Sequence, residues 1–454
     1  MVEGAAEGAL GPRVRQAFHL RLGVLSKRRN AGIFNERSPL LESRPKAGST
    51  PVFDETDPTN PPPVSGAWFE GDDPADRRFS QFTGGRPFVL ESGESLELPD
   101  LAFETWGELN EDASNAVLVC HALTGDSHAA SHPGGHTPEA AHGTSPDGWW
   151  ERVVGPGKTI DTNKYYAVCA NVLGGCQGST GPASVDPGAG MLYGPTFPQV
   201  SIRDQVRAQA KLADQLGIQT WVSVVGGSMG GMQALEWAVT FPDRVRSVAA
   251  LASTACSTAQ QIAWSQAGRM AIMADSHWNA GWYYGGGPGH GPHRGLATAR
   301  VVAMIHYRSD TEFNRRFGRT SSHGQPAAEH GAEFDIERYL AYQGAKFVRR
   351  FDANSYIMLN HMMDLHDLGR GRGGIGPALS RVRCPLFTAS VSTDFLYPEY
   401  QQRELVEGFE AAGQWTTHVM IDADTGHDGF LTHGEQVEPQ LRSFLDKIAS
   451  EPQI

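Results

Sequence analysis

The stretch from Trp221 to Phe241, WVSVVGGSMGGMQALEWAVTF, constrains the fold more than any other part of the chain. Its first five residues are apolar and partly β-branched, which favours a short buried strand. Residues 229–239 are rich in helix formers, and their apolar members recur at helical spacing. Ser228 stands between these two segments, among glycines. The stretch therefore predicts a strand, a tight turn at Ser228 and a helix, in that order.

The glycines around Ser228 indicate that this serine is a nucleophile. Gly226 and Gly230 stand two residues before and two residues after it, which matches the G-x-S-x-G pattern. In that pattern a strained turn lifts the hydroxyl above the sheet and leaves little room for neighbouring side chains. The backbone N–H of Met229, which opens the helix, can stabilise an oxyanion. A flexible or close-packed glycine loop is the alternative, and the strand–turn–helix context favours the nucleophile.

Composition excludes several other classes of function. The net charge of −13 at pH 7 argues against a nucleic-acid-binding surface. No apolar run approaches the roughly 18 residues of a membrane span, so we expect no membrane partner. The five cysteines are odd in number and form no CxxC pair, which predicts reduced thiols in a reducing, cytoplasmic compartment. The seventeen histidines lack HExxH spacing, so we expect no metal site.

Strand-like and helix-like segments alternate over much of the chain. The strand-like runs are residues 115–120, 165–172, 221–225, 246–252, 384–392 and 417–422. With helical segments between them, they predict a mostly parallel sheet covered by helices. Residues 256–380 break the alternation, and we interpret them as an inserted, mainly helical lid. We expect a disordered extension at 1–75, with a transit peptide or a wrongly chosen start codon as the alternatives. Residues 76–255 and 381–454 together should form an α/β core.

Two late strand ends complete a catalytic constellation. Asp394 and His427 each follow one of the last two strand-like runs, so nucleophile, acid and histidine occur in that order. Order and placement match an α/β-hydrolase triad. His427 would take the proton of Ser228, and Asp394 would orient the imidazole. Asp428 is the rival for the acid, and Asp394 is preferred because a residue adjacent to the histidine usually points its side chain elsewhere.

Two further segments offer binding groups. The strand at 115–120 runs into the loop HALTGD, where the backbone N–H of Leu123 is a candidate second oxyanion donor and an ordinary turn is the alternative. In the lid, Arg300 and Tyr307 are seven residues apart and therefore share one helix face. A guanidinium can bind a carboxylate through two hydrogen bonds, whereas a solvated helix face is the alternative. The triad leaves the acyl acceptor open, since water gives a hydrolase and an alcohol gives a transferase.

Seven motifs taken together resemble the homoserine O-acetyltransferase family. They are HALTGDSH, NVLGGCQGSTGPAS, FPQVSIRD, GGSMGGMQALEWA, FVRRFDANSY, STDFLYP and GHDGFL. The resemblance implies an α/β-hydrolase fold with a helical lid. It also implies ping-pong transfer of an acyl group from acetyl-CoA to the hydroxyl of homoserine, in methionine biosynthesis, with no permanently bound cofactor. Residues 1–75 and the stretch Gly285–Gly295 depart from the family pattern.

The resemblance carries eight site residues over to this chain: catalytic Ser228, Asp394 and His427, oxyanion-hole Leu123 and Met229, and substrate-binding Arg300, Tyr307 and Asp428. Of the last three, the arginine would bind the substrate carboxylate, the tyrosine would assist it, and the aspartate would contact the amino group. The resemblance further implies a homodimer built through the lids.

Three hypotheses remain open at this point. A homoserine O-acetyltransferase predicts release of CoA that depends on homoserine, although close relatives use succinyl-CoA or accept serine. A carboxylic ester hydrolase predicts turnover without any amino-acid acceptor. A non-catalytic interaction protein on the same fold predicts that Ser228 is inert toward acyl-CoA.

Overall fold

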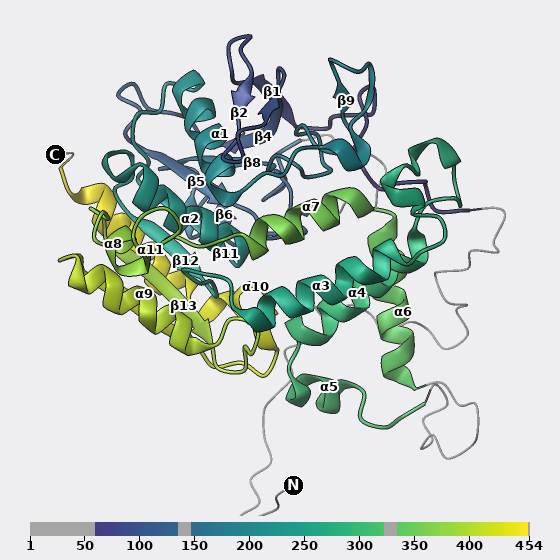
Figure 1. Ribbon diagram of the computed structural model, residues 1–454. Coiled ribbons are helices and arrows are strands. Elements are labelled where there is room, and N and C mark those ends of the chain that lie inside the picture. Colours follow the sequence, from purple (N-terminus) through teal and green to yellow (C-terminus); the bar gives the residue numbers. More distant parts are fainter. Residues whose placement is uncertain (1–59, 135–146, 322–333, 453–454) are drawn as a thin grey trace, which may run out of the picture. The chain divides into compact units, whose positions relative to one another are not determined.

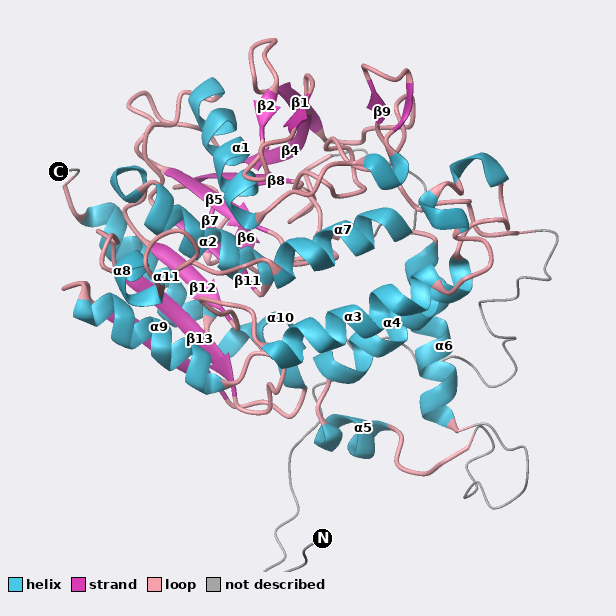
Figure 2. Ribbon diagram, in the orientation of Figure 1, coloured by secondary structure: helices cyan, strands magenta, loops and turns pink. Residues whose placement is uncertain are grey.

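A computed structural model describes residues 60–134, 147–321 and 334–452, and an eight-stranded sheet lies at its centre (Figure 2). In spatial order its strands are β1 (Arg78–Gln81), β4 (Asp100–Trp106), β8 (Tyr166–Ala170), β5 (Ala116–Cys120), β11 (Ser223–Gly227), β12 (Val248–Leu251), β13 (Leu386–Val391) and β14 (Thr416–Ile421). The strands from β8 to β14 pair in parallel, and β1 and β4 add an antiparallel edge. The predicted mostly parallel sheet is confirmed.

Helices bury both faces of this sheet. Alternate residues of β5 point to opposite faces, so Leu118 joins one core cluster while Val117 and Val119 join the other. The first cluster is covered by α1 (Ile202–Gln215), α2 (Met229–Thr240) and α9 (Glu399–Ala411), and the second by α11 (Glu438–Ser450). Burial on both sides explains why the strand-like runs are almost continuously apolar in sequence.

Small sheets and short helices complete the core. Three two-stranded sheets pair β2 (Phe88–Val89) with β3 (Ser95–Leu96), β6 (Val154–Gly155) with β7 (Ile160–Asp161), and β9 (Val185–Asp186) with β10 (Met191–Leu192). Near the chain end, η5 (Gly426–Asp428) and α10 (Gly429–Thr432) follow β14. They form the connection that carries His427.

The segment between β12 and β13 forms a helical lid. Its helices are α3 (Ala259–Met273), α4 (His293–Tyr307), α5 (Asp310–Arg316), α6 (Asp335–Val348), α7 (Ala353–Asp364) and α8 (Ile375–Leu379). Helix α4 packs between α3 and α6, and α7 packs on α3 (Figure 1). None of the helices in the described ranges is both long and apolar enough to cross a membrane.

Residues 60–75 pack on the core, contrary to the predicted extension at 1–75. Ala67 is fully buried, and the N–H of Trp68 donates to the carbonyl of Cys176 at 2.9 Å. Irregular backbone can be held by such bonds without any periodic pattern in the sequence. The boundary predicted at residue 75 is therefore wrong for this part, and residues 1–59 lie outside the described residues.

The order of the parallel strands reverses at β5. The chain passes from β5 to β8 on one side, and β11 lies on the other side of β5. Where the order reverses, the loops after the two neighbouring strands diverge and leave a crevice at their carboxyl ends. The loop after β5 contains Leu123, and the turn after β11 contains Ser228. The topology thus brings these two residues to one crevice.

Candidate active site

Ser228 occupies a turn that its flanking glycines permit. Its φ of 56° and ψ of −123° are rare for a residue with a side chain and cost about 1–3 kcal/mol. A Cβ on Gly230 would lie 2.1 Å from the carbonyl oxygen of Cys120, and one on Gly226 would lie 2.7 Å from the same atom. Strand β5 therefore passes too close for any larger residue at either position. This geometry is that of the predicted nucleophile turn.

Asp394 and His427 form a buried pair at the ends of β13 and β14. The Nδ1 atom of His427 donates to Oδ2 of Asp394 at 2.7 Å. The other carboxylate oxygen accepts from the N–H groups of Leu396 and Tyr397 at 2.8 and 2.9 Å. Burial alone would lower the pKa of His427, but the Asp394 carboxylate outweighs burial and raises it. The imidazole is thus held with Nε2 available as a proton acceptor.

Asp428, the rival acid, has a different partner. Its Oδ2 lies 3.1 Å from Nη2 of Arg308, and Nη1 of the same arginine donates to Glu312 at 3.1 Å. Its other carboxylate oxygen makes no hydrogen bond within the residues that the structure describes. The geometry therefore pairs His427 with Asp394, and Asp428 keeps one free oxygen. Sequence reasoning missed Arg308, whose only signal was its place directly after Tyr307.

Tyr397 lies close to both the serine and the histidine. It lines the same cavity as Ser228, and its ring centroid lies 5.1 Å from that of His427. Within the described ranges no hydrogen bond joins Ser228 to His427 directly; such bonds are often long before substrate binds. The sequence analysis did not select Tyr397, although it lies three residues after Asp394 within STDFLYP.

Leu123 and Met229 present backbone N–H groups at the crevice. Leu123 lines the same cavity as Ser228, and Met229 directly follows the serine at the start of α2. Neither N–H donates a hydrogen bond to any group in the described part of the chain. The His121 side chain shapes the loop before Leu123, because it accepts from the N–H of Val172 at 3.1 Å. Two unpaired donors beside a nucleophile are what a developing oxyanion requires.

Lid residues close the cavity over Ser228. Trp264 of α3, His306 of α4 and Asp364 of α7 belong to its lining. Burial lowers the pKa of His306 to about 3, so this imidazole is neutral at physiological pH. Asp364 forms an ion pair of 2.6 Å with the buried Arg269. Among the described lining residues there is consequently no unpaired cation.

Arg300 and Tyr307 share one face of α4, as their spacing predicts. The guanidinium carbon of Arg300 lies 5.9 Å from the ring centroid of Tyr307 and 5.2 Å from that of Phe347. The Tyr307 ring is in turn 5.8 Å from the His427 ring. Arg300 is half-buried and makes no ion pair or hydrogen bond with other described residues. A cation in this state favours an anionic ligand near the Tyr307 ring, and that ring lines the cavity at Ser228, whereas Arg300 itself does not.

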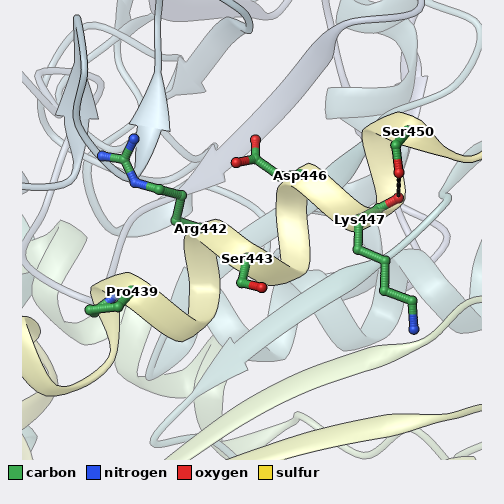
Figure 3. A pocket seen from close by; sticks show the side chains of 6 residues that line it. All are labelled: Pro439, Arg442, Ser443, Asp446, Lys447 and Ser450. Carbon is green, nitrogen blue, oxygen red and sulfur yellow. Dashed lines mark hydrogen bonds between the residues drawn. The ribbon is translucent and has the colours of Figure 1, made fainter.

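A second depression of the described surface lacks comparable chemistry. It is lined by residues of α11 alone, Pro439, Arg442, Ser443, Asp446, Lys447 and Ser450 (Figure 3). It holds no histidine, and the Ser450 hydroxyl donates to the carbonyl of Lys447 on its own helix. Nor do the described ranges contain a cluster of three or more His, Cys, Asp or Glu residues that could hold a metal. The crevice at Ser228 is therefore the candidate active site.

Comparisons with known proteins identify the fold and the family. Residues 115–434 match the model of the alpha/beta hydrolase fold family. The chain is 50% identical over 390 residues to the homoserine O-acetyltransferase of Thermobifida fusca (strain YX), covering 86% of this chain and 99% of that protein. Among solved structures, homoserine O-acetyltransferase from Bacillus anthracis superposes with a TM-score of 0.73 at 25% identity, over 82% of this chain and 97% of that one. Esterase E22 superposes with the same TM-score at 26% identity, over 82% and 100%. These matches confirm the predicted α/β-hydrolase fold.

Proposed function

The chain belongs to the homoserine O-acetyltransferase family, and we propose that it moves an acetyl group from acetyl-CoA to the side-chain hydroxyl of L-homoserine. The product, O-acetylhomoserine, would serve methionine biosynthesis. The observation that carries this proposal is the unpaired Arg300 guanidinium, which lies 5.9 Å from the Tyr307 ring, itself 5.8 Å from the His427 ring. It offers the site a receptor for an amino-acid carboxylate.

In the first half-reaction, the Ser228 hydroxyl attacks the thioester carbonyl while His427 takes its proton. The N–H groups of Leu123 and Met229 stabilise the oxyanion of the tetrahedral intermediate. Collapse of this intermediate breaks the C–S bond, and His427 returns the proton to the departing CoA thiolate. An acetyl-serine remains. Asp394 keeps the imidazole in one tautomer throughout and stabilises its charged form.

In the second half-reaction, the hydroxyl of homoserine attacks the acetyl-serine. His427 now removes the proton of that hydroxyl and returns it to Ser228 when the ester bond to the serine breaks. Arg300 binds the α-carboxylate and Tyr307 supports it from the same helix face. The free carboxylate oxygen of Asp428 receives the ammonium group. No permanently bound cofactor takes part in either step.

The charges of the cavity favour acetyl over succinyl as the transferred group. Succinyl carries a second carboxylate, which needs a cation within reach. The one charged side chain among the described lining residues is the carboxylate of Asp364. It already forms an ion pair with Arg269, so this arginine is not available to a second carboxylate. His306 is uncharged there. Among these lining residues an acetyl group would meet only neutral side chains and one paired acid, whereas a succinyl carboxylate would have to reach the Arg300 guanidinium, which does not line the cavity.

We further propose that the enzyme is a cytoplasmic homodimer built through its lids. Large apolar side chains are exposed on the lid, namely Ile262, Met270 and Met273 on α3, Trp282 and Ile305. Association would remove this surface from water. Light scattering should give twice the monomer mass, and Met270→Glu should shift the protein toward monomer. A monomeric wild-type enzyme would contradict the dimer.

A thiol-release assay tests the reaction. Acetyl-CoA and succinyl-CoA are each supplied with no acceptor, with L-homoserine or with L-serine, and Ser228→Ala is the blank. We expect release from acetyl-CoA that depends on homoserine and disappears in the blank. Release with serine as acceptor, or from succinyl-CoA, would instead identify the corresponding relative of the family.

A carboxylic ester hydrolase is the second candidate, because esterase E22 shares the fold over 82% of this chain. Hydrolysis uses the same triad with water in place of homoserine. Equal release of CoA with and without homoserine would support the hydrolase and contradict the transferase.

A further inference from the structure

A lid residue anchors the loop that carries the Leu123 N–H. Arg350 lies between α6 and α7, and its Nη2 donates to the carbonyl of Thr124 at 2.6 Å and to the carboxylate of Asp126 at 3.3 Å. Thr124 directly follows Leu123. We propose that Arg350 is a positioning residue, which holds the Leu123 N–H where the oxyanion develops. This inference rests on the acyl transfer proposed above.

The loop has the geometry for such control. The N–H of Gly125 donates to the carbonyl of Ala122 at 2.9 Å, which closes a β-turn with Leu123 and Thr124 at its centre. The carbonyl that Arg350 binds belongs to the peptide between Thr124 and Gly125. Fixing that peptide fixes the turn, and with it the direction of the Leu123 N–H one residue earlier. A glycine at the next position would otherwise let this peptide rotate.

Arg350 is itself fixed by the core. The Gln177 side-chain amide donates to the Arg350 carbonyl at 2.8 Å and to the Gly66 carbonyl at 3.2 Å. Gln177 comes from the loop NVLGGCQGSTGPAS, so three motifs that are far apart in sequence meet at this arginine. Because this hydrogen bond fixes the Arg350 backbone, the guanidinium is held at a defined distance from the Leu123 loop.

Besides the turn's own bond from Gly125 to Ala122, further contacts hold the two ends of the loop. At one end the His121 ring bonds the N–H of Val172, and at the other the Ser127 hydroxyl donates to the buried Glu104 at 2.8 Å. The Asp126 side chain is 5% exposed, so its ion pair with Arg350 is little screened by water. Loss of Arg350 would leave the Thr124 carbonyl without this donor and Asp126 without this cation.

The test compares two adjacent arginines in the full-length enzyme. Arg350→Gln removes the anchor and Arg350→Lys keeps a cation. Arg349→Gln is the matched control, because among the described residues the Arg349 side chain donates its hydrogen bonds to the carbonyl and side chain of Asn60 and not to the Leu123 loop. Displacing a catalytic group by about 1 Å can cost about 100-fold. We therefore expect Arg350→Gln to lower kcat/KM for acetyl-CoA by about 10- to 100-fold, lysine to restore part of the loss, and Arg349→Gln to match the wild type.

A second readout separates positioning from general damage. In a trifluoromethyl ketone analogue of acetyl-CoA, the Ser228 oxygen adds to the ketone carbonyl and the resulting oxyanion lies in the oxyanion hole. CoA itself forms no such adduct. Arg350→Gln should lower the affinity for the ketone by the same factor by which it lowers kcat/KM, and it should leave the affinity for CoA unchanged. If Arg350→Gln does not fold, Asp126→Asn, which breaks the ion pair, should show the same split.

Two results would overturn the proposal: equal behaviour of Arg350→Gln and Arg349→Gln, or equal weakening of the ketone and CoA. Failure of the wild type to release CoA with homoserine would instead refute the proposed transferase. The two failures are therefore distinguishable.

Discussion

The carboxyl-terminal edge of the parallel sheet, here called the sheet edge, and the lid both contribute to one cavity. They differ in whether their buried charged groups have partners. At the sheet edge, buried His427 is paired with Asp394, and the carboxylate raises its pKa in spite of burial. In the lid, buried His306 has no such partner, and burial lowers its pKa to about 3. The lid also leaves Arg300 without a partner among the described residues. Two histidines at similar depth thus differ because only one faces a carboxylate.

This difference assigns the two regions different tasks. Short connections after parallel strands hold the sheet-edge groups to each other, which suits bond making and breaking. The lid holds the Arg300 cation without an anionic partner, which suits binding of the carboxylate of one substrate. We therefore expect sheet-edge variants to affect both half-reactions and lid variants to affect one.

The largest effect should come from Ser228→Ala. Both half-reactions need the serine oxygen, so kcat should fall by about 10⁴-fold or more, with little change in thermal stability. Mass spectrometry after mixing with acetyl-CoA should detect no acetylated protein, whereas the wild type should carry one acetyl group. Acetylation of the variant elsewhere at the wild-type rate would break the assignment of the nucleophile.

Asp394→Asn should be next, with a loss of about 10³- to 10⁴-fold in kcat. The pH dependence gives a second signature. His427 must be neutral to accept a proton, and its pKa is raised, so wild-type acylation should be lost on acidification at a midpoint above the usual value of 6.5. Without the carboxylate, burial would dominate, and the midpoint should move to lower pH. An unchanged midpoint would contradict the pairing.

Arg300→Gln should affect only the second half-reaction. Losing a charge-assisted hydrogen bond of about 1.5–3 kcal/mol should raise the KM for homoserine by about 10- to 100-fold. The rate of acetylation of Ser228 by acetyl-CoA, measured in a single turnover, should stay within about twofold. This half-reaction is the internal control. An equal loss in both half-reactions would place Arg300 at the acyl donor instead.

His306→Gln should have the smallest effect on the rate. It tests whether His306, unlike His427, stays neutral over the pH range of activity. Because His306 is already neutral, its replacement should leave the midpoint of the acid limb unchanged. The rate should fall by at most about fivefold, because the His306 ring makes no hydrogen bond with other described residues, and one neutral hydrogen bond to a substrate would be worth about 1 kcal/mol. A shift of the acid limb in the pH–rate profile would show that His306 titrates in the active range.

Much of the catalytic centre was accessible from local patterns. The glycines at 226 and 230 and the order of Ser228, Asp394 and His427 depend on neighbours in the chain and on strand ends, both of which leave marks in the sequence. The shared face of Arg300 and Tyr307 follows from helical period alone.

Other residues could not be recognised in this way. The ring contact of Tyr397 with His427, the pairing of Arg308 with Asp428 and the bond from Arg350 to Thr124 all join residues distant in the chain. Nor did composition show that residues 60–75 pack on the core, because their anchoring uses backbone groups that every residue possesses.

The sequence by itself determined the parallel sheet, the turn at Ser228 and the order of the catalytic groups, because period, glycine spacing and strand order are properties of a linear chain. Only the tertiary structure decided which carboxylate faces His427, which cation remains unpaired and which arginine supports the Leu123 loop. These depend on distances between separate elements, and such distances are set by packing of the whole core rather than by any local stretch.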